Sequence, residues 1–254
     1  MSKVFTTVGV LTAVRDGLLD LDAPITRYLP GFTVSSIFEE HPEKRITLRH
    51  LLSHTAGFTH EAPVGNNFDP AEPDFDAHAA SIAKTWLMFP VGTRQSYSNL
   101  GIDLAGAILE EVTHRPFSDS MAERVFQPLG LARTTMDVGV VRADSGRVVG
   151  RRRGFPDLPI FVPMTAAGGA WSTAHDLQSF VRFMLSEGSG SGLLPASAFT
   201  ALKTTPMRGS FGLGVTFGRF KDDLFFNHGG GGFGFLTYMA WYPTYGIGIT
   251  VHKR

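Results

Sequence analysis

The stretch Gly92-Thr93-Arg94-Gln95-Ser96-Tyr97-Ser98-Asn99 places a phenol and an amide two residues apart, just before a long helical pattern. Side chains two residues apart on an extended or tightly looped backbone point the same way. A phenol that moves a proton and an amide that holds a carbonyl group are therefore predicted to face one cleft. Tyr-x-Asn is common by chance, so this prediction depends on partners elsewhere in the chain.

The composition is that of an ordinary globular protein. The chain has 254 residues, 43% hydrophobic and 18% charged, which suffices for one large domain or two lobes sharing a core. With 23 acidic and 23 basic residues the net charge is zero, so charge gives no argument for nucleic acid or an anionic membrane as partner. The absence of cysteine excludes disulfides, thiol nucleophiles and Cys metal sites.

Residues 3–16 are predicted to form an amphipathic helix. Apolar residues recur at helical spacing from Val4 to Val14, and Gly17 ends the pattern. A signal peptide is the alternative, but threonines interrupt the apolar run and no cleavage site precedes Arg15. No run is apolar and long enough to span a bilayer. The chain as written is therefore expected to be cytoplasmic, without a membrane partner.

The middle of the chain is predicted to be mainly helical. Thr47 is a candidate N-cap for a short helix that buries three leucines and closes at Gly57. Thr173 and Asp176 form an approximate capping box before another apolar stripe that ends at Gly188. Between these two helices, the sequence predicts further helices over residues 77–89, from Leu104 to Val112, and over residues 117–125.

The hydrophobic period changes near the C-terminal end. Residues 212–220, 235–242 and 246–252 are predicted strands, the last two joined by a Pro243–Gly246 turn. Helices followed by antiparallel strands indicate an α+β fold. No internal repeat is present.

The run His228-Gly229-Gly230-Gly231-Gly232 is a second candidate for the site. Glycines allow a ligand to approach the backbone closely, and a main-chain N–H there can serve an oxyanion. A phosphate-binding loop is not predicted, because no Gly-Lys-Ser/Thr follows. The alternative is a flexible turn between strands.

Three other patterns have weaker functional interpretations. His50 and His54 have a metal-ligand spacing, but third-ligand candidates lie in loops, so capping or packing is preferred for His54 and no metal or cofactor is predicted. Ser81-Ile82-Ala83-Lys84 matches Ser-x-x-Lys and is interpreted as a chance match on a surface-like helix. The basic segment 138–163 lacks interleaved aromatics, so it is interpreted as a solvated loop and not as a nucleic-acid site.

Taken together, these blocks resemble the serine β-lactamase-related family of class C β-lactamases, D-Ala-D-Ala carboxypeptidases and esterases. The matching blocks occur in the family's order, from Ser2-Lys3-Val4-Phe5-Thr6, through residues 21–30 and 46–57, to Tyr97-Ser98-Asn99, Pro128-Leu129-Gly130 and His228-Gly229-Gly230. The resemblance implies a β-lactamase/transpeptidase-like fold, an antiparallel sheet flanked by helices with a helical subdomain. One domain would span residues 1–254, with the helical subdomain at about 18–160 and an α/β part formed by 1–17 and 161–254.

The resemblance also implies roles for the site residues. Lys3 would be the lysine of Ser-x-x-Lys, and Tyr97 would shuttle protons between the nucleophile, Lys3 and the leaving group. Asn99 would bind the acyl side of the substrate. His228 stands where β-lactamases usually carry Lys and, with Gly229 and Gly230, would bind substrate, while Gly231 would offer an oxyanion N–H. A histidine is a weaker, pH-dependent cation, which favours ester or peptide substrates over penicillins.

The sequence departs from the family pattern at both ends. The nucleophilic serine of Ser-x-x-Lys would precede Met1, and Ser2 cannot share a helix face with its neighbour Lys3. N-terminal strands and a C-terminal helix are also expected to be missing, leaving an unpaired sheet edge. The sequence thus predicts a serine hydrolase acting on a small ester, β-lactam or peptide, inactive as written. The alternative is a non-catalytic binding protein that retains the cleft. The oligomeric state is not predicted.

Overall fold

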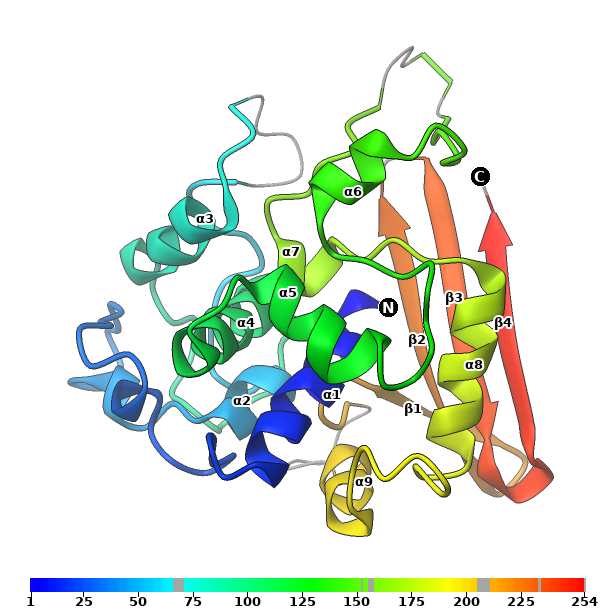
Figure 1. The fold of residues 1–254 in the computed structure, drawn as a ribbon. Coiled ribbons are helices and arrows are strands. Elements are labelled where there is room, and N and C mark those ends of the chain that lie inside the picture. Colours follow the sequence, from blue (N-terminus) through cyan, green and yellow to red (C-terminus); the bar gives the residue numbers. More distant parts are fainter. Residues whose placement is uncertain (66–70, 152, 155–157, 205–210, 233, 254) are drawn as a thin grey trace.

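The computed structural model describes residues 1–65, 71–151, 153–154, 158–204, 211–232 and 234–253 of the chain. The helices α1 to α9 come first along the chain, and the strands β1 to β4 follow them (Figure 1). The helices are α1 (Ser2–Arg15), α2 (Leu48–Leu52), α3 (Phe75–Ser81), α4 (Asn99–Thr113), α5 (Phe117–Met121), α6 (Val138–Ala143), α7 (Thr165–Gly168), α8 (Ala174–Leu185) and α9 (Ala196–Lys203). The strands are β1 (Thr216–Phe220), β2 (Asp223–Gly232), β3 (Phe235–Tyr242) and β4 (Ile247–Lys253).

The four strands form an antiparallel sheet in the order β1-β2-β3-β4, with α8 lying across one face (Figure 1). Gly248 allows this close packing, because a Cβ there would lie 2.3 Å from Cγ1 of Val181 on α8. The opposite face carries apolar side chains that are about half exposed, among them Leu236, Ile247 and Val251. The predicted α+β architecture with an antiparallel sheet is confirmed.

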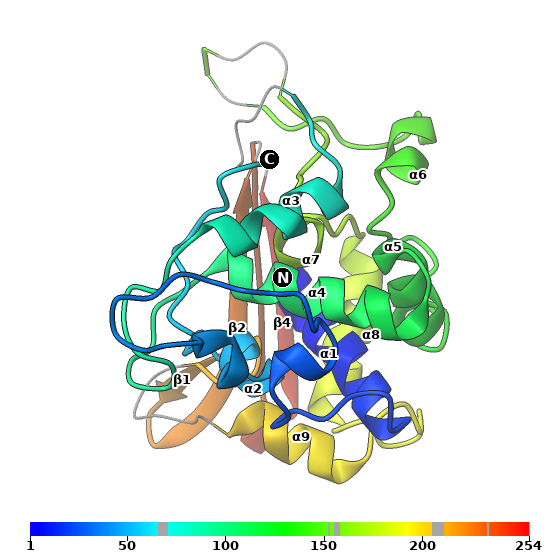
Figure 2. The same ribbon diagram turned by 90° about the vertical axis from the view of Figure 1, so that its left-hand side faces the viewer.

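Helix α1 occupies the centre of the molecule, packed among α4, α5 and α7 (Figure 2). The helix is where the sequence predicts it, but the prediction that it is amphipathic is wrong, since every residue from Ser2 to Ala13 is buried. Two of its threonines, Thr6 and Thr12, are satisfied inside the protein, whereas Oγ1 of Thr7 is buried without a hydrogen-bond partner among the described residues. The Thr6 hydroxyl donates to Ala166 O at 2.7 Å, and the Thr12 hydroxyl donates to Gly9 O at 2.7 Å. A helix buried on all sides can carry hydroxyls that are hydrogen-bonded in this way.

The predicted N-cap at Thr47 is confirmed, and it fixes the start of α2. The Thr47 side chain accepts from the His50 N–H, while the His50 ring accepts from the Thr47 N–H, which completes a capping box. The predicted end at Gly57 is wrong, because the helix ends at Leu52 and His54 adopts a left-handed conformation with φ 60°. Gly57 serves a later turn, where a Cβ would lie 2.6 Å from Phe89 O.

The predictions for the next two helices are not equally accurate. The helix predicted over residues 77–89 is α3 followed by the 3₁₀ turn Ile82–Lys84, and it stops there because Trp86 and Leu87 form bridges with Ser35 and Phe58. Helix α4 is confirmed, with Ser98 as its N-cap, and its apolar stripe is buried except for the partly buried Val112.

Strand β2 rules out the alternative that the glycine run is a flexible turn. Gly229 to Gly232 pair with residues Phe235 to Tyr238 of β3, in register with His228 opposite Met239. Glycine has a low strand propensity, but pairing with a strand rich in aromatic and β-branched residues outweighs that preference. The glycine run is therefore held in the sheet.

Candidate active site

Lys3 lies in the first turn of α1 and is 4% exposed. Its ammonium nitrogen donates to Ala167 O at 2.8 Å and lies 5.0 Å from the centroid of the Tyr97 ring. Burial lowers the pKa of Lys3 to about 8, although the negative charges of Asp103 and Glu61 raise it in part. An appreciable fraction of Lys3 is therefore neutral under mildly alkaline conditions and able to accept a proton.

Tyr97 lies in a cluster of rings that come from distant parts of the chain. The His54 ring is 4.4 Å away, between centroids, and the Phe211 and His228 rings are 5.8 Å and 6.5 Å away. Burial, and then the negative charge of Glu61, raises the pKa of Tyr97 above its usual value. The phenol is therefore protonated at neutral pH and is a proton donor beside Lys3.

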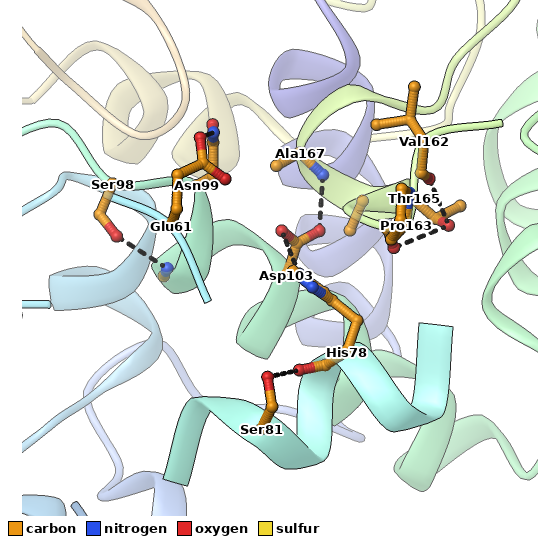
Figure 3. Close-up of polar contacts among 12 residues, drawn as sticks. Glu61, His78, Ser81, Ser98, Asn99, Asp103, Val162, Pro163, Thr165 and Ala167 are labelled. Carbon is orange, nitrogen blue, oxygen red and sulfur yellow. Dashed lines mark hydrogen bonds and ion pairs between the residues drawn. The ribbon is translucent and has the colours of Figure 1, made fainter. Parts of the chain in front are cut away.

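Asn99 begins α4, immediately after the Ser98 cap. It is 6% exposed, and its amide nitrogen donates to Oε1 of Glu61 at 2.9 Å (Figure 3). Glu61 also acts electrostatically on Tyr97. Glu61 is therefore a common neighbour through a hydrogen bond to Asn99 and an electrostatic effect on Tyr97, and the shared cleft stays a prediction.

Glu61 is a member of the site that no sequence pattern indicates. Its Oε1 also lies 2.8 Å from Nδ1 of His60, whereas its Oε2 is buried without a hydrogen-bond partner among the described residues. Glu61 lies in an irregular segment after Gly57, where neither periodicity nor a motif gives it a role. It contributes a negative charge between Asn99 and the Lys3–Tyr97 pair.

His228 lies on the face of β2 that is turned toward α1, and it is 5% exposed. Burial, followed by the charges of the N-terminal amino group and Lys3, lowers the pKa of His228 well below its usual value. The expectation of a pH-dependent cation at this position is therefore corrected, because the imidazole is neutral at physiological pH. Its Nε2 is buried without a partner among the described residues.

The glycines after His228 alternate between the two faces of β2. Gly230 is on the same face as His228, where a Cβ would lie 2.6 Å from Oγ1 of Thr237 and 3.3 Å from the Met1 nitrogen. The Gly229 carbonyl accepts from the Met1 nitrogen at 3.3 Å. Gly231 pairs with Leu236 of β3, and its oxyanion role stays a prediction.

The amino end of α1 lies beside His228 and the glycines that follow it. The Met1 nitrogen is 3.4 Å from Nδ1 of His228, so a residue joined to Met1 at this nitrogen would lie beside His228. The hydroxyl of Ser2 accepts from the Ala170 N–H at 3.1 Å. As the sequence predicts, Ser2 does not share the face of α1 that carries Lys3.

His54 lies two residues after the end of α2 and packs against the Tyr97 ring. It is 2% exposed, and burial, followed by the charge of Lys3, lowers its pKa to about 3. Its Nδ1 accepts from the Ser98 N–H at 3.3 Å, so the proton of the neutral ring is on Nε2. That Nε2–H is buried without a partner among the described residues.

The remaining motifs have structural positions. The Ser81 hydroxyl donates to His78 O at 2.7 Å and is buried, which agrees with a chance match to Ser-x-x-Lys. No group of three potential His, Cys, Asp or Glu metal ligands gathers within the described ranges. Among the same residues, no helix is long and apolar enough to cross a membrane. In the basic segment, Arg142 pairs with Glu72, and Arg152 lies outside the described residues.

A family model described as Beta-lactamase matches residues 1–252. Esterase EstB of Burkholderia gladioli is 31% identical over 58% of this chain and 38% of its own length. The D-alanyl-D-alanine-carboxypeptidase/endopeptidase AmpH of Escherichia coli K12 is 24% identical over 99% of this chain and 68% of its own length. The chain spans from about a third to about two thirds of the length of the curated relatives it matches.

The fold has a solved counterpart in the octameric penicillin-binding protein homologue from Pyrococcus abyssi. The two superpose with a TM-score of 0.83 at 22% identity, over 99% of this chain and 60% of that chain. At this identity the likeness concerns the fold, which is β-lactamase/transpeptidase-like.

Proposed function

Because the chain belongs to the Beta-lactamase family, we propose that its cleft supports hydrolysis of an ester or amide bond through an acyl-serine intermediate. The observation that carries the proposal is the convergence of Lys3, Tyr97 and His228 from α1, the loop before α4 and β2. Ionisable groups of shifted pKa that gather from distant segments are typical of a functional site. A buried lysine of lowered pKa beside a protonated phenol is suited to moving protons.

The proposed nucleophile is a serine joined to Met1 in a longer chain. Ser-x-x-Lys places it three residues before Lys3, one helical turn away, and the Met1 nitrogen already lies beside His228. Neutral Lys3 would take the proton from the serine hydroxyl as its oxygen bonds to the substrate carbonyl carbon. Tyr97 would protonate the leaving group and regain its proton from Lys3. Water would then hydrolyse the acyl-serine.

The charges of the cleft favour esters and peptide-like amides over penicillins. β-Lactam substrates carry a carboxylate, yet His228 is neutral and Glu61 brings a negative charge toward Tyr97 and Asn99. The name of one relative, an esterase, agrees with this choice. We therefore propose a small ester as the first substrate to test.

A binding protein without catalysis is the second candidate. The hydroxyl groups of Ser2 and Ser81 are both hydrogen-bonded to the main chain, so neither is positioned for activation by Lys3. A chain that lacks the proposed serine would keep the cleft and lose covalent chemistry.

The two candidates are separated by three versions of the protein. One is the 254-residue chain, one carries an N-terminal extension that places Ser directly before Met1, and the matched control has Ala there. A fluorophosphonate label should attach to the added Ser, and only that version should hydrolyse p-nitrophenyl butyrate. If the Ser version is folded but reacts no faster than the Ala version, the binding protein is favoured. Labelling of Ser81 in the 254-residue chain would overturn the proposed nucleophile.

A further inference from the structure

The ammonium group of Lys3 is hydrogen-bonded to a main-chain carbonyl, and the N–H of the same residue makes a second hydrogen bond. The residue is Ala167 of α7, whose carbonyl accepts from Lys3 at 2.8 Å. Its N–H donates to Oδ1 of Asp103 at 2.9 Å, and Asp103 is fully buried in α4, one turn after Asn99 (Figure 3). One residue of α7 thus connects the lysine of the site to a buried carboxylate.

The other oxygen of this carboxylate faces a buried histidine. Oδ2 of Asp103 lies 3.1 Å from Nε2 of His78 in α3, and neither side chain is exposed. Nδ1 of His78 lies 2.8 Å from Val64 O, which only accepts hydrogen bonds, so Nδ1 carries a proton. Since an ionised carboxylate also only accepts, both ring nitrogens donate, and His78 and Asp103 form a buried ion pair.

The surroundings hold His78 in this orientation. The Ser81 hydroxyl donates to His78 O at 2.7 Å and accepts from the Val64 N–H at 3.3 Å. These two hydrogen bonds connect the segment that contains Val64 to α3. Gly106 lets α4 approach α7, because a Cβ there would lie 2.5 Å from Cβ of Ala166. The pair, its acceptor and its link to Lys3 are all fixed by packing.

A buried ion pair is a poor source of stability, because an apolar pair of similar size often serves the fold as well. Its effect on Lys3 is more specific. The groups that act on Lys3 are Asp103 and Glu61, which raise its pKa, with Tyr97, His54, His228 and the N-terminal amino group also nearby. Asp103 is the fully buried carboxylate of this set, so solvent screens it least, and His78 balances its charge.

We propose that Asp103 and His78 are a positioning pair for Lys3. The pair fixes the Ala167 peptide group that holds the ammonium group of Lys3, and it sets the charge that this ammonium group faces. The pair touches no substrate and acts through Lys3. Its importance for catalysis rests on the proposed function, but its effect on Lys3 does not.

The test measures the protonation of Lys3 directly, in the 254-residue chain and without substrate. Lysine labelled with ¹³C at Cε is followed by NMR against pH, and the Lys3 signal is identified by its loss in Lys3→Met. Asp103→Asn should lower the pKa of Lys3 by about one unit, because the nearby negative charge is removed. His78→Gln should raise it, because Asp103 then loses its balancing cation. Asp119→Asn and His175→Gln, two exposed positions, are the matched controls and should leave it unchanged.

The outcomes separate this proposal from the proposed function. An unchanged pKa of Lys3 in folded Asp103→Asn, or a lowered one in His78→Gln, would overturn the pairing. Should both variants fail to fold, ¹⁵N NMR of the wild-type chain decides, since His78 must carry protons on both nitrogens at pH 7 and a neutral ring contradicts the ion pair. Absence of hydrolysis by the Ser-extended chain would reject the proposed function alone.

Discussion

The ammonium nitrogen of Lys3 lies 5.0 Å from the centroid of the Tyr97 ring, and both groups are largely withdrawn from water. Burial acts on them in opposite directions, lowering the pKa of the lysine and raising that of the phenol. The result is an amine that releases its proton more readily beside a phenol that keeps its own. Such a pair passes a proton from one group to the other only when a third group, such as a hydroxyl nucleophile, joins them.

Lys3→Met should abolish the proposed catalysis by removing the proton acceptor. In the Ser-extended chain we expect kcat/KM for p-nitrophenyl butyrate to fall about 10²–10⁴-fold, the usual contribution of a positioned base. Lys3→Arg is the matched variant, which keeps the charge but releases no proton near neutral pH, so it should be equally inactive. An active Lys3→Arg variant would show that charge, and not proton transfer, is what Lys3 supplies.

Tyr97→Phe should reduce turnover with little effect on stability. The change removes the phenolic hydroxyl and keeps the ring contacts with His54 and Phe211. We expect kcat in the Ser-extended chain to fall about 10²-fold or more, while urea denaturation gives a free energy of unfolding within about 1 kcal/mol of the parent. A loss of stability with kcat preserved would assign Tyr97 a packing role instead.

Glu61→Gln should shift the acid limb of the pH–activity profile to lower pH. Glu61 raises the pKa of Lys3 and of Tyr97 through its negative charge, so the isosteric amide lowers both. Because the neutral form of Lys3 is the active base, half-maximal activity should be reached up to about one unit lower in pH. The profile of kcat against pH for the Ser-extended chain checks this, and a shift toward higher pH contradicts it.

His228 should make the protein less stable as the pH falls. Its pKa is lowered in the folded state, so below the unfolded value of about 6.5 the unfolded chain binds a proton that the folded chain does not. Stability is therefore lost as the pH decreases from about 6.5, by about 1.4 kcal/mol per pH unit for this one group. His228→Asn should reduce the slope of unfolding free energy between pH 6 and 5 by about that amount.

The control for this measurement is His175→Gln, at an exposed position, which should leave the slope unchanged. His54 should behave like His228, since its pKa is lowered to about 3. His78 behaves oppositely. Burial lowers the pKa of His78, but the hydrogen bond and charge of Asp103 outweigh burial and raise the pKa overall. The contribution of His78 to folding stability is therefore present below pH 6.5 and is lost as the pH rises. An unchanged slope in His228→Asn would mean that the folded His228 is protonated.

Gly106→Ala should destabilise the fold by forcing α4 and α7 apart. The added methyl group would lie 2.5 Å from Cβ of Ala166, and a backbone shift to relieve this contact typically costs about 1–3 kcal/mol. Gly31→Ala is the control, because nothing lies within 4 Å of a Cβ there. Thermal unfolding measures both, and equal melting temperatures would contradict the tight packing of α7 against α4.

Local patterns in the sequence predicted the elements that depend on neighbouring residues. The Thr47 and Thr173 caps, the apolar stripe of α4 and the strand Phe235–Tyr242 are all confirmed, because capping and hydrophobic periodicity act within a few residues. The errors occur where distant contacts decide. Strand β2 contains four successive glycines that only pairing with β3 keeps extended, and the predicted amphipathic α1 is surrounded by other helices.

The order of the motifs was sufficient to indicate the family, and the structure places Lys3 and His228, two of the residues it named, near the Tyr97 ring. The division into a helical subdomain and an α/β part, and the individual roles of these residues, stay predictions. Glu61 and the Asp103–His78 pair follow no pattern along the chain, since each is defined by partners on other elements.

The sequence by itself determined the capped and periodic elements, such as α2, α4, α8 and β3, and the family motifs, because these follow from local periodicity, caps and motif order. Tertiary structure alone decided the protonation of the ionisable groups in those motifs. The withdrawal of Lys3, Tyr97 and His228 from water, and the placement of Glu61 and Asp103 beside them, come from contacts between distant segments. Since burial and nearby charges set a pKa, a sequence that names a histidine or a lysine leaves its charge state to the fold.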